Sequence, residues 1–226
     1  MKKEDRFQIQ TSFFKLQATG FRLPGLPTGR KLSNLLDERE LILQLKNGNE
    51  SAFRQLVELF QHRVYNTVLS IIQSQEDAED LCQEVFIEVY RSVHLFKGEA
   101  KVSTWMYRIA SNKALEFLRK KKTQKRFAFV RSLFVQNDEP EIQPGHFDHP
   151  GVQLENKERG RVLFAAIDKL PDNQRVAYVL CNLEGLSYQE ICESMELSKS
   201  SVESLLFRAK QNLRKLLKDF YEQDYE

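Results

Sequence analysis

The sequence predicts an all-α protein made of two small helical domains joined by a flexible acidic linker. Apolar residues recur every three or four positions through the long segments, which is the period of an amphipathic helix. Nine glycines and six prolines among 226 residues are too few for a strand-rich sandwich with many turns. Leu, Glu, Lys, Gln and Arg, which favour helices, dominate the same segments. We expect an N-terminal extension over 1–36, a first domain over 37–126, a linker over 127–158 and a second domain over 159–220.

The N-terminal extension shows no periodic pattern. Its glycines and prolines crowd between Gly20 and Gly29, and its charge is mainly basic. We expect a mobile tail, or a start codon assigned too far upstream. An arm that touches a partner or DNA is the alternative.

Two helices open the first domain. Asp37 and Glu40 have the spacing of a capping box, which predicts a short helix that ends at Asn47-Gly48. The next helix carries one broad apolar stripe, formed by Phe53, Leu56, Val57, Phe60, Val64, Val68, Ile71 and Ile72. This stripe predicts a bundle with the two charged helices that follow.

The third predicted helix is acidic on its outer face. All six charged residues from Glu76 to Glu88 are acids. The residues at helical spacing that face the core are Ala78, Leu81, Val85, Val89 and Val93. Asp80, Gln83 and Glu84 then point outward, which predicts contact with a basic partner.

The fourth predicted helix is basic, and it follows the loop Phe96-Lys97-Gly98. Ser103 or Thr104 is its expected N-cap. Its apolar stripe consists of Met106, Ile109, Ala110, Ala114, Phe117 and Leu118. The opposite face carries Arg108, Asn112 and Arg119, whose spacings of four and seven align donors suited to phosphates and base edges. From Lys97 to Arg126, ten Lys and Arg residues stand against two acids, so we expect this face to bind a polyanion.

The composition changes between Gln136 and Glu158. Prolines and glycines interrupt any helix there, and six acids stand against Lys157 alone. We expect a linker whose charge keeps it solvated. The alternative is a flexible acidic strand that lies in a basic channel as a nucleic-acid mimic.

The second domain ends in a helix-turn-helix pattern. A first helix is expected to end at Pro171, Asp172 caps a second, and Gly185 ends it. Ser187 and Glu190 then form a capping box that begins a short helix, and a longer helix starts near Lys199. The expected buried positions are Ile191, Met195, Leu197, Val202 and Leu206, and the exposed ones are Lys199, Ser200, Ser201, Glu203, Ser204 and Arg208. With the basic helix upstream, this pattern favours DNA binding over a purely structural helix pair.

No motif indicates catalysis, a cofactor or a metal. The sequence has no glycine-rich phosphate loop, no metal-ligand spacing and no nucleophile paired with a base, so we expect no enzymatic activity. Cys82, Cys181 and Cys192 lack CxxC spacing and are expected to be small core residues in a reducing compartment, while His146 and His149 have no third ligand. No apolar run approaches the ~18 residues of a membrane span, and no signal-peptide core is present. We expect a cytoplasmic protein.

Three ordered motifs resemble those of bacterial RNA polymerase sigma factors of the extracytoplasmic-function (ECF) class. The first is Asp77-Ala78-Glu79-Asp80-Leu81-Cys82-Gln83-Glu84-Val85-Phe86. The second is Phe96-Lys97-Gly98 followed by Ser103-Thr104-Trp105-Met106-Tyr107-Arg108-Ile109-Ala110 and Asn112, and the third is Leu170-Pro171 with Leu186-Ser187-Tyr188-Gln189-Glu190-Ile191. The resemblance covers roughly Leu41 to Leu217. It implies a region-two-like domain followed by a region-four-like domain.

The resemblance also implies a role for each surface. The residues that would bind the clamp helices of the largest subunit of core RNA polymerase are Asp80, Gln83, Glu84 and Phe86. Those that would read and open the −10 promoter element are Lys97, Gly98, Thr104, Trp105, Arg108, Asn112, Lys113 and Arg119. Those that would read the −35 element are Lys199, Ser200, Ser201, Glu203, Ser204 and Arg208. Further implied partners are the polymerase flap, through the C-terminal domain, and an anti-sigma factor.

Opening a duplex requires a group that captures a base once it has left the stack. We expect the loop from Phe96 to Thr104 to form that pocket, with Trp105 either as a wedge at the edge of the bubble or as a core residue. Three residues depart from the family pattern: Glu203 stands where a basic residue is common, Leu205 where an arginine is common, and Glu196 at a turn position that often holds glycine. The −35 promoter sequence that this chain prefers therefore cannot be inferred from the preferences of its relatives.

Two other classes of protein are open alternatives. A stand-alone helix-turn-helix regulator would use the first domain for dimerisation or sensing, and it would bind its operator without polymerase. A helical adaptor with no nucleic-acid role would leave the basic run from Lys97 to Arg126 unexplained. Adding the protein to sigma-free core polymerase and testing for promoter-specific transcripts separates the three.

Overall fold

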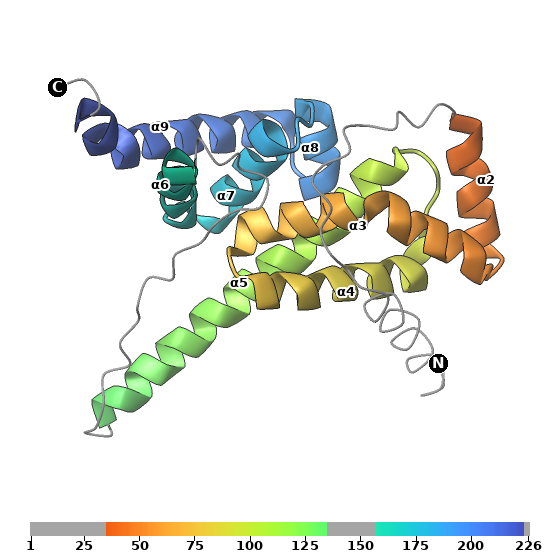
Figure 1. The fold of residues 1–226 in the computed structure, drawn as a ribbon, viewed down its shortest axis with the longest axis horizontal. Helices are drawn as coiled ribbons and strands as arrows, with labels where there is room; N and C mark the ends of the chain where they lie inside the picture. Colours follow the sequence, from red (N-terminus) through yellow and green to blue (C-terminus); the bar gives the residue numbers. More distant parts are fainter. Residues whose placement is uncertain (1–34, 135–156, 224–226) are drawn as a thin grey trace.

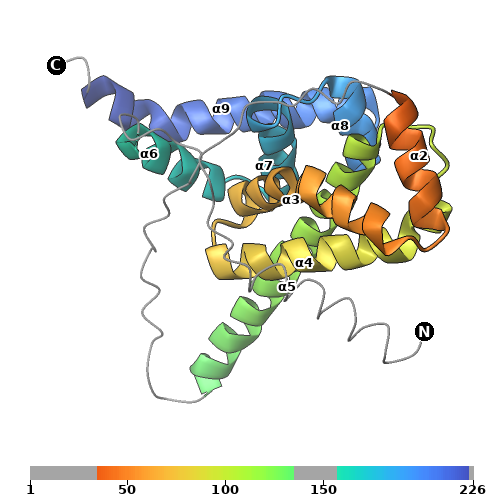
Figure 2. The same cartoon turned by 45° about the vertical axis from the view of Figure 1, so that its right-hand side comes forward.

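A computed structural model describes residues 35–134 and 157–223 of the chain. Every regular element within these residues is helical, which confirms the predicted all-α class. The helices form two packed groups that lie against each other (Figure 1; Figure 2). The N-terminal extension, most of the predicted linker, and the pair His146 and His149 fall outside the described residues.

The first group contains four α-helices and one short 3-10 turn. These elements are α2 (Leu35–Lys46), α3 (Glu50–Ile72), α4 (Gln75–Ser92), η1 (Val93–Leu95) and α5 (Val102–Phe134). Helices α3, α4 and α5 pack pairwise on one another, and α2 packs on α3 at one end. All five core positions predicted for the acidic helix are buried, and so are most of those predicted for α3. The predicted amphipathic stripes therefore converge on one core.

Local capping explains where α3 and α4 begin and end. The Asn49 side chain accepts hydrogen bonds from the backbone N–H groups of Ser51 and Ala52, which starts α3. Gln73 ends it in the left-handed conformation, at φ 57°. The Ser74 hydroxyl then accepts from the backbone N–H of Asp77 and caps α4. These two caps make a tight corner that brings the acidic helix back along α3.

Three predicted boundaries are wrong. Helix α2 begins at Leu35, so Asp37 lies inside the helix and is not its N-cap. Helix α5 begins at Val102, so Ser103 and Thr104 lie in its first turn, and the backbone N–H of Trp105 donates to Lys101 O instead. Helix α5 also continues to Phe134, past the expected end of the domain at residue 126, and its far half projects from the body (Figure 1).

The second group packs around the last helix. Its elements are α6 (Lys157–Asp168), α7 (Asp172–Tyr178), the π-helical turn η3 (Val179–Leu183), α8 (Tyr188–Met195) and α9 (Lys199–Gln223). Helix α9 packs against α6, α7 and α8. The predicted capping box is present, with Ser187 and Glu190 exchanging hydrogen bonds. Helix α9 therefore forms the long edge of the helix-turn-helix domain (Figure 2).

The turn between α8 and α9 contains the backbone strain expected from the sequence. Glu196 ends α8 in the left-handed conformation, at φ 55°, where glycine is favoured. A side chain in that conformation costs about 1 kcal/mol. The turn is compact despite this cost, because the backbone N–H groups of Glu196 and Leu197 both donate to Cys192 O.

The two domains make direct contact, which the sequence did not predict. The first half of α5 packs on α8, and α3 contacts η3 and α6. Both views place α8 beside the start of α5 (Figure 1; Figure 2). The three cysteines are free thiols, and burial raises the pKa of Cys82 to about 12. Among residues 35–134 and 157–223, no helix combines the length and apolar character needed to cross a bilayer.

Candidate nucleic-acid and protein interfaces

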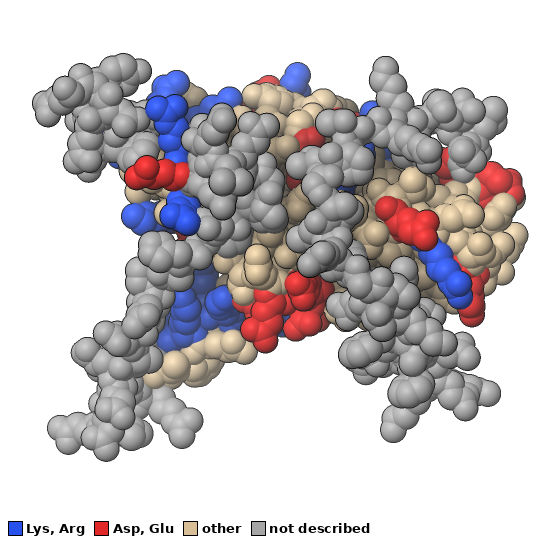
Figure 3. Space-filling model, in the orientation of Figure 1, with Lys and Arg blue, Asp and Glu red and all other residues tan. Residues whose placement is uncertain are grey.

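The outer face of α4 presents the predicted acids to solvent. Asp80 and Glu84 are exposed, and Gln83 is half-buried beside them. Acidic side chains gather over α4, next to basic side chains over α5 (Figure 3). The acidic and basic segments that follow each other in the sequence therefore also lie side by side on one surface. Where they meet, Lys113 Nζ of α5 lies 3.4 Å from Glu84 Oε2 of α4.

Phe86 does not belong to that acidic surface. Its side chain is 1% exposed and lies in the core of the first domain. A partner that binds the outer face of α4 does not reach it in this structure. The prediction that Phe86 contacts a partner is corrected on this point: its role here is to hold α4 against the bundle, since a buried aromatic ring supplies much packing area.

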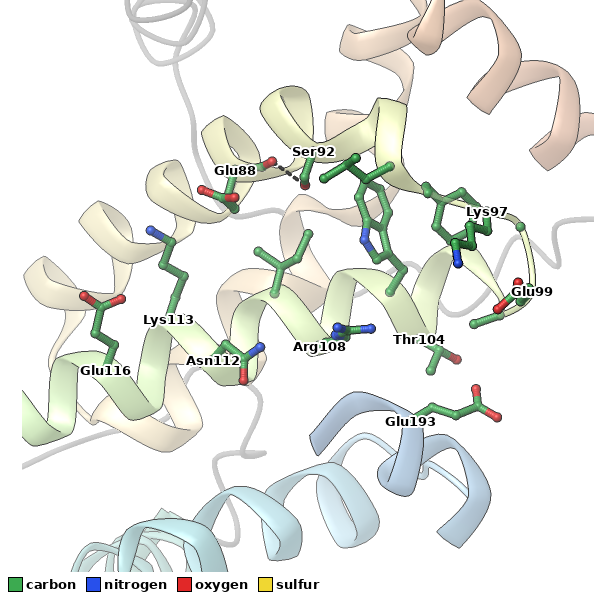
Figure 4. Close-up of a pocket in the computed structure, with 16 residues that line it drawn as sticks. Glu88, Ser92, Lys97, Glu99, Thr104, Arg108, Asn112, Lys113, Glu116 and Glu193 are labelled. Carbon is green, nitrogen blue, oxygen red and sulfur yellow. Dashed lines mark hydrogen bonds between the residues drawn. The ribbon is translucent and has the colours of Figure 1, made fainter. Parts of the chain in front are cut away.

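An open pocket of about 920 Å³ lies between the end of α4, the loop after it and the first turns of α5 (Figure 4). Seven of the eight residues predicted to handle the −10 element line it: Lys97, Gly98, Thr104, Trp105, Arg108, Asn112 and Lys113. Arg119 does not line it and lies exposed farther along α5. Polar donors, a guanidinium and an indole thus converge on a space large enough for an unstacked base.

Packing holds the pocket wall in place. The rings of Trp105 and Phe96 lie 4.8 Å apart between centroids and are tilted by 36°. Phe96 is buried, and its carbonyl oxygen accepts a hydrogen bond of 2.7 Å from Lys46 Nζ of α2. Gly98 adopts φ 77°, a conformation that suits glycine in the loop. Trp105 is half-buried, so it packs on the core and also faces the pocket.

Several residues of the pocket were not predicted. Glu88 and Ser92 of α4 line it, and the Ser92 hydroxyl donates to Glu88 O at 2.6 Å (Figure 4). Glu88 and Ser92 follow Glu84 at steps of four residues, so helical spacing could have placed them on the same face of the helix. Glu116 also lines the pocket, and its pKa is lowered by the hydrogen bond and charge of Lys120. Glu193 arrives from α8, and no local pattern could have indicated it.

The residues predicted to handle the −10 element differ in their accessibility. Lys97, Gly98, Arg108 and Asn112 are exposed, and Lys113 is half-buried. Thr104 is buried at 3% exposure, so its contribution to the pocket is a wall rather than an open hydroxyl. Arg108 forms an ion pair with Glu196 of the second domain. This pair uses part of the hydrogen-bonding capacity of the Arg108 guanidinium.

The first turns of α9 present the predicted −35 residues on an open face. Lys199, Ser200, Glu203 and Arg208 are exposed, and Ser201 and Ser204 are half-buried. Ser198 begins the helix by accepting from the Ser201 backbone N–H, at 3.3 Å. Among the predicted apolar positions, Ile191, Val202 and Leu206 are buried, and Met195 and Leu197 are partly buried. Helix α9 is therefore free to enter a groove, and the acidic Glu203 lies on that face.

Comparison with known proteins matches two separate regions of the chain. Residues 56–124 match the family model described as Sigma-70 region 2, and residues 161–213 match Sigma-70, region 4. The chain is similar to the ECF RNA polymerase sigma-E factor of Escherichia coli (strain K12), with 32% identity over 180 residues that cover 80% of this chain and 94% of that protein. The protein of the same name from Haemophilus influenzae is 31% identical, and the alignment covers 80% of this chain and 95% of that protein.

Two solved structures share the fold. One is CnrH in complex with the cytosolic domain of CnrY, with a TM-score of 0.58, 23% identity and coverage of 80% of this chain and 97% of that one. The other is the sigma factor RpoE in complex with the anti-sigma factor NepR from Bartonella quintana, with a TM-score of 0.55, 22% identity and coverage of 74% and 96%. None of these matches favours a stand-alone helix-turn-helix regulator. The chain belongs to the ECF family of RNA polymerase sigma factors, and as an alternative sigma factor it directs RNA polymerase to promoters.

Proposed function

We propose that three separate surfaces divide the work of promoter-directed initiation. The exposed acids of α4 bind the clamp helices of the largest polymerase subunit, the pocket at the start of α5 captures bases of the −10 element, and the first turns of α9 read the −35 element. The observation that carries this proposal is the pocket, where seven of the eight predicted −10 residues converge beside the acidic face. The second domain would also contact the polymerase flap.

The acidic face suits a protein partner better than DNA. Asp80 and Glu84 lie on a rigid helix whose inner side is fully packed. Exposed carboxylates add little to folding stability, but against a basic surface they set association rate and specificity. The carboxylates of this face would repel phosphates. We therefore expect α4 to face the polymerase and α5 to face DNA.

The pocket suits an unstacked base better than a paired one. Lys97, Arg108 and Lys113 supply positive charge for the backbone, and Asn112 supplies an amide that can bond to a base edge. Trp105 offers an aromatic face, and base–aromatic stacking contributes about 1–3 kcal/mol per base. Unpairing costs a few kcal/mol, so contacts of this kind are of the size needed to offset it. All covalent chemistry would belong to the polymerase.

An anti-sigma factor is a further proposed partner. Both solved structures that share this fold carry a bound protein, described for RpoE as the anti-sigma factor NepR. By analogy, a protein that covers either the acidic face of α4 or the promoter-facing surfaces would inactivate this chain.

The test of the function is reconstitution with sigma-free core polymerase. Wild-type protein should yield promoter-specific transcripts, whereas Glu84→Lys should bind core roughly tenfold more weakly or worse, because reversed charge repels a complementary surface. Glu58→Lys, at an exposed acid on α3, is the matched control and should bind normally. Normal co-purification of Glu84→Lys with core in moderate salt would contradict the assignment of the α4 face. Specific operator binding without polymerase would favour the stand-alone regulator.

A further inference from the structure

The two helices that enclose the pocket at the start of α5 offer different hydrogen-bonding groups to it. Glu88 and Ser92 lie one helical turn apart on α4, and both line the pocket (Figure 4). Arg108, Asn112 and Lys113 line it from α5. The α5 side chains all carry N–H donors, whereas the only polar atoms of the two α4 side chains are oxygens. We call Glu88 and Ser92 the α4 pair.

Ser92 is an acceptor toward the pocket. Its hydroxyl hydrogen is used within α4, because Ser92 Oγ donates to the backbone carbonyl oxygen of Glu88 at 2.6 Å. A serine hydroxyl has one hydrogen to donate and two lone pairs that can accept. The lone pairs of Ser92 Oγ remain, and its side chain is half-buried at the pocket. A ligand in the pocket therefore meets an acceptor at this position.

The carboxylate of Glu88 has no partner within the protein. In the two described ranges, 35–134 and 157–223, no hydrogen bond or ion pair involves its carboxylate oxygens. Lys113 pairs instead with Glu84, one turn earlier on α4. Glu88 is half-buried in the wall of an open pocket, so water can hydrate it in the free protein. A ligand that displaces this water has to donate hydrogen bonds in its place.

The other acids around the pocket are less suited to hold a ligand in one orientation. Glu116 Oε1 lies 2.8 Å from Lys120 Nζ. Glu193 comes from α8, where its carboxylate accepts a hydrogen bond of 3.0 Å within that helix. Glu99 is exposed on the loop before α5. Only the α4 pair combines a helical backbone, partial burial and acceptors that no other described side chain uses.

The four DNA bases differ in what they can donate to such a wall. Cytosine, adenine and guanine each carry an exocyclic amine, whose two hydrogens can reach two acceptors. Thymine carries no amine, and its exocyclic polar atoms are two carbonyl oxygens. The α4 pair can share the hydrogens of one amine, but a thymine carbonyl would place acceptor against acceptor. An unpaired acceptor that has lost its water is costly, so thymine fits this wall poorly.

We propose that the α4 pair selects the captured base of the −10 element by its exocyclic amine and rejects thymine there. Glu88 and Ser92 Oγ accept the two amine hydrogens, and a donor of α5 bonds to another acceptor on the base. Trp105 and Leu95, which is 69% exposed at the pocket, offer apolar surface to the faces of the ring. This specificity rests on the proposed function, because it requires that the pocket captures a base.

The proposal divides the acids of α4 between two partners. Asp80 and Glu84 are exposed and belong to the surface proposed to bind polymerase, whereas Glu88 is half-buried and lines the pocket. A substitution of Glu88 should therefore change the choice of base and leave binding to core polymerase unchanged. Glu84→Lys should do the opposite, so the two residues give separable results.

Transcription from promoters with altered −10 bases tests the selection. Promoters are first selected from a randomised duplex pool with wild-type protein and core polymerase. Each non-template base of the −10 element is then replaced by thymine, and separately by an analogue that lacks only the amine. The analogues are purine for adenine, 2-pyrimidinone for cytosine and hypoxanthine for guanine. All these templates are mismatched across the −10 region, so the strength of base pairing does not contribute.

At one −10 position, both replacements should lower the transcript yield of the wild-type holoenzyme at least fivefold. A specific contact between a side chain and a base edge discriminates roughly 5- to 150-fold. Glu88→Gln adds an N–H donor that can face a carbonyl, so it should tolerate thymine several-fold better at that position. Ser92→Ala removes one acceptor and should reduce the effect of the missing amine. Glu58→Gln, at an exposed acid of α3, is the control and should discriminate as wild type does.

Three results would overturn the proposal. The first is a wild-type holoenzyme that makes promoter-specific transcripts and tolerates thymine and the analogues at every −10 position. The second is full discrimination in both Glu88→Gln and Ser92→Ala, with folding checked by circular dichroism. The third is weaker core binding by Glu88→Gln with unchanged base preference, which would place Glu88 at the polymerase. In each case promoter-specific transcripts from wild-type protein leave the proposed function standing, and their absence would refute that function itself.

Discussion

Trp105 shows how one side chain can belong both to a core and to a binding pocket. Its ring packs on the buried Phe96, and its other side faces the pocket at the start of α5. The sequence left these roles as alternatives. The half-buried position is compatible with both, because an indole has enough surface to pack on one face and stack a base on the other.

Trp105→Ala should impair initiation on duplex promoters and be largely rescued on a template mismatched across the −10 region. The reason is that a premelted template no longer requires the few kcal/mol that offset unpairing. Transcript yield on the two templates, with circular dichroism as a check on folding, measures this. Glu84→Lys should stay inactive on both templates, and equal impairment of Trp105→Ala on both would refute a melting role.

Glu203 is the residue of α9 with the clearest consequence for promoter choice. It is exposed on the face of α9 proposed to read the −35 element, where a carboxylate would accept a hydrogen bond from a cytosine amine and repel phosphate. Glu203→Lys should change base preference at one or two −35 positions by about 1–3 kcal/mol. Lys210→Ala should weaken all promoters alike. Selection from randomised −35 DNA distinguishes the two patterns. If the Glu203→Lys variant keeps the wild-type base preference, Glu203 does not read −35 bases.

At the scale of elements, the far half of α5 adds a basic arm to the surface proposed to face DNA. Lys125 and Arg126 are exposed on it, with Phe127 beside them at 72% exposure. The helix runs to Phe134 while the bundle beneath it ends earlier (Figure 1). Because Lys125 and Arg126 are exposed, their cations are available for phosphates.

Lys125→Gln combined with Arg126→Gln should weaken binding of the polymerase complex to every promoter and lower the salt slope by about 2, because each lost phosphate contact removes about 0.9 from it. Filter binding over a range of salt concentrations measures the slope. Lys169→Gln, at an exposed residue of the second domain, is the control. A changed base preference, or an unchanged slope, would contradict a role limited to phosphates.

The acidic and basic helices also show what a sequence pattern specifies well. The apolar stripes of α3, α4 and α5 were predicted almost residue for residue, because helical periodicity is a local property. Their starts were predicted less well. The expected caps at Asp37 and at Ser103 or Thr104 failed, because several nearby polar residues can cap a helix and packing selects among the possible starts.

At the scale of the whole molecule, we expect Glu184 to make the contact between the two domains depend on pH. Burial at the interface raises its pKa, and the hydroxyls of Thr67 and Tyr107 and the charge of Arg63 oppose that effect. A carboxyl group whose pKa is raised by an interdomain contact favours that contact where it is protonated. The contact should therefore weaken as the pH rises from the ordinary carboxyl pKa through the raised value. Glu190, with a pKa of about 2, stays ionised throughout this interval.

In Glu184→Gln the two domains should hold together more tightly than in wild type at neutral pH, and this part of the pH dependence should be lost. Energy transfer between dyes at Glu58→Cys and Lys215→Cys reports the contact between the domains, in a background of Cys181→Ser and Cys192→Ser. Cys82 can remain, because burial keeps its thiol protonated and inaccessible. The readout is the difference between the two proteins. Identical pH profiles would show that Glu184 does not affect the contact between the domains.

The sequence by itself determined the helical class, the order of the two domains, the acidic and basic faces and most of the residues around the pocket. All of these depend on periodicity and on motifs whose residues lie close together in the chain. The tertiary structure alone decided that Phe86 is core, that Glu193 reaches the pocket and that the two domains lie against each other. Those facts depend on contacts such as Lys101 with Glu190 and Tyr107 with Glu184, which join residues far apart in the chain. No local pattern encodes such a pairing, because it arises only when two finished surfaces meet and their charges and buried polar groups match.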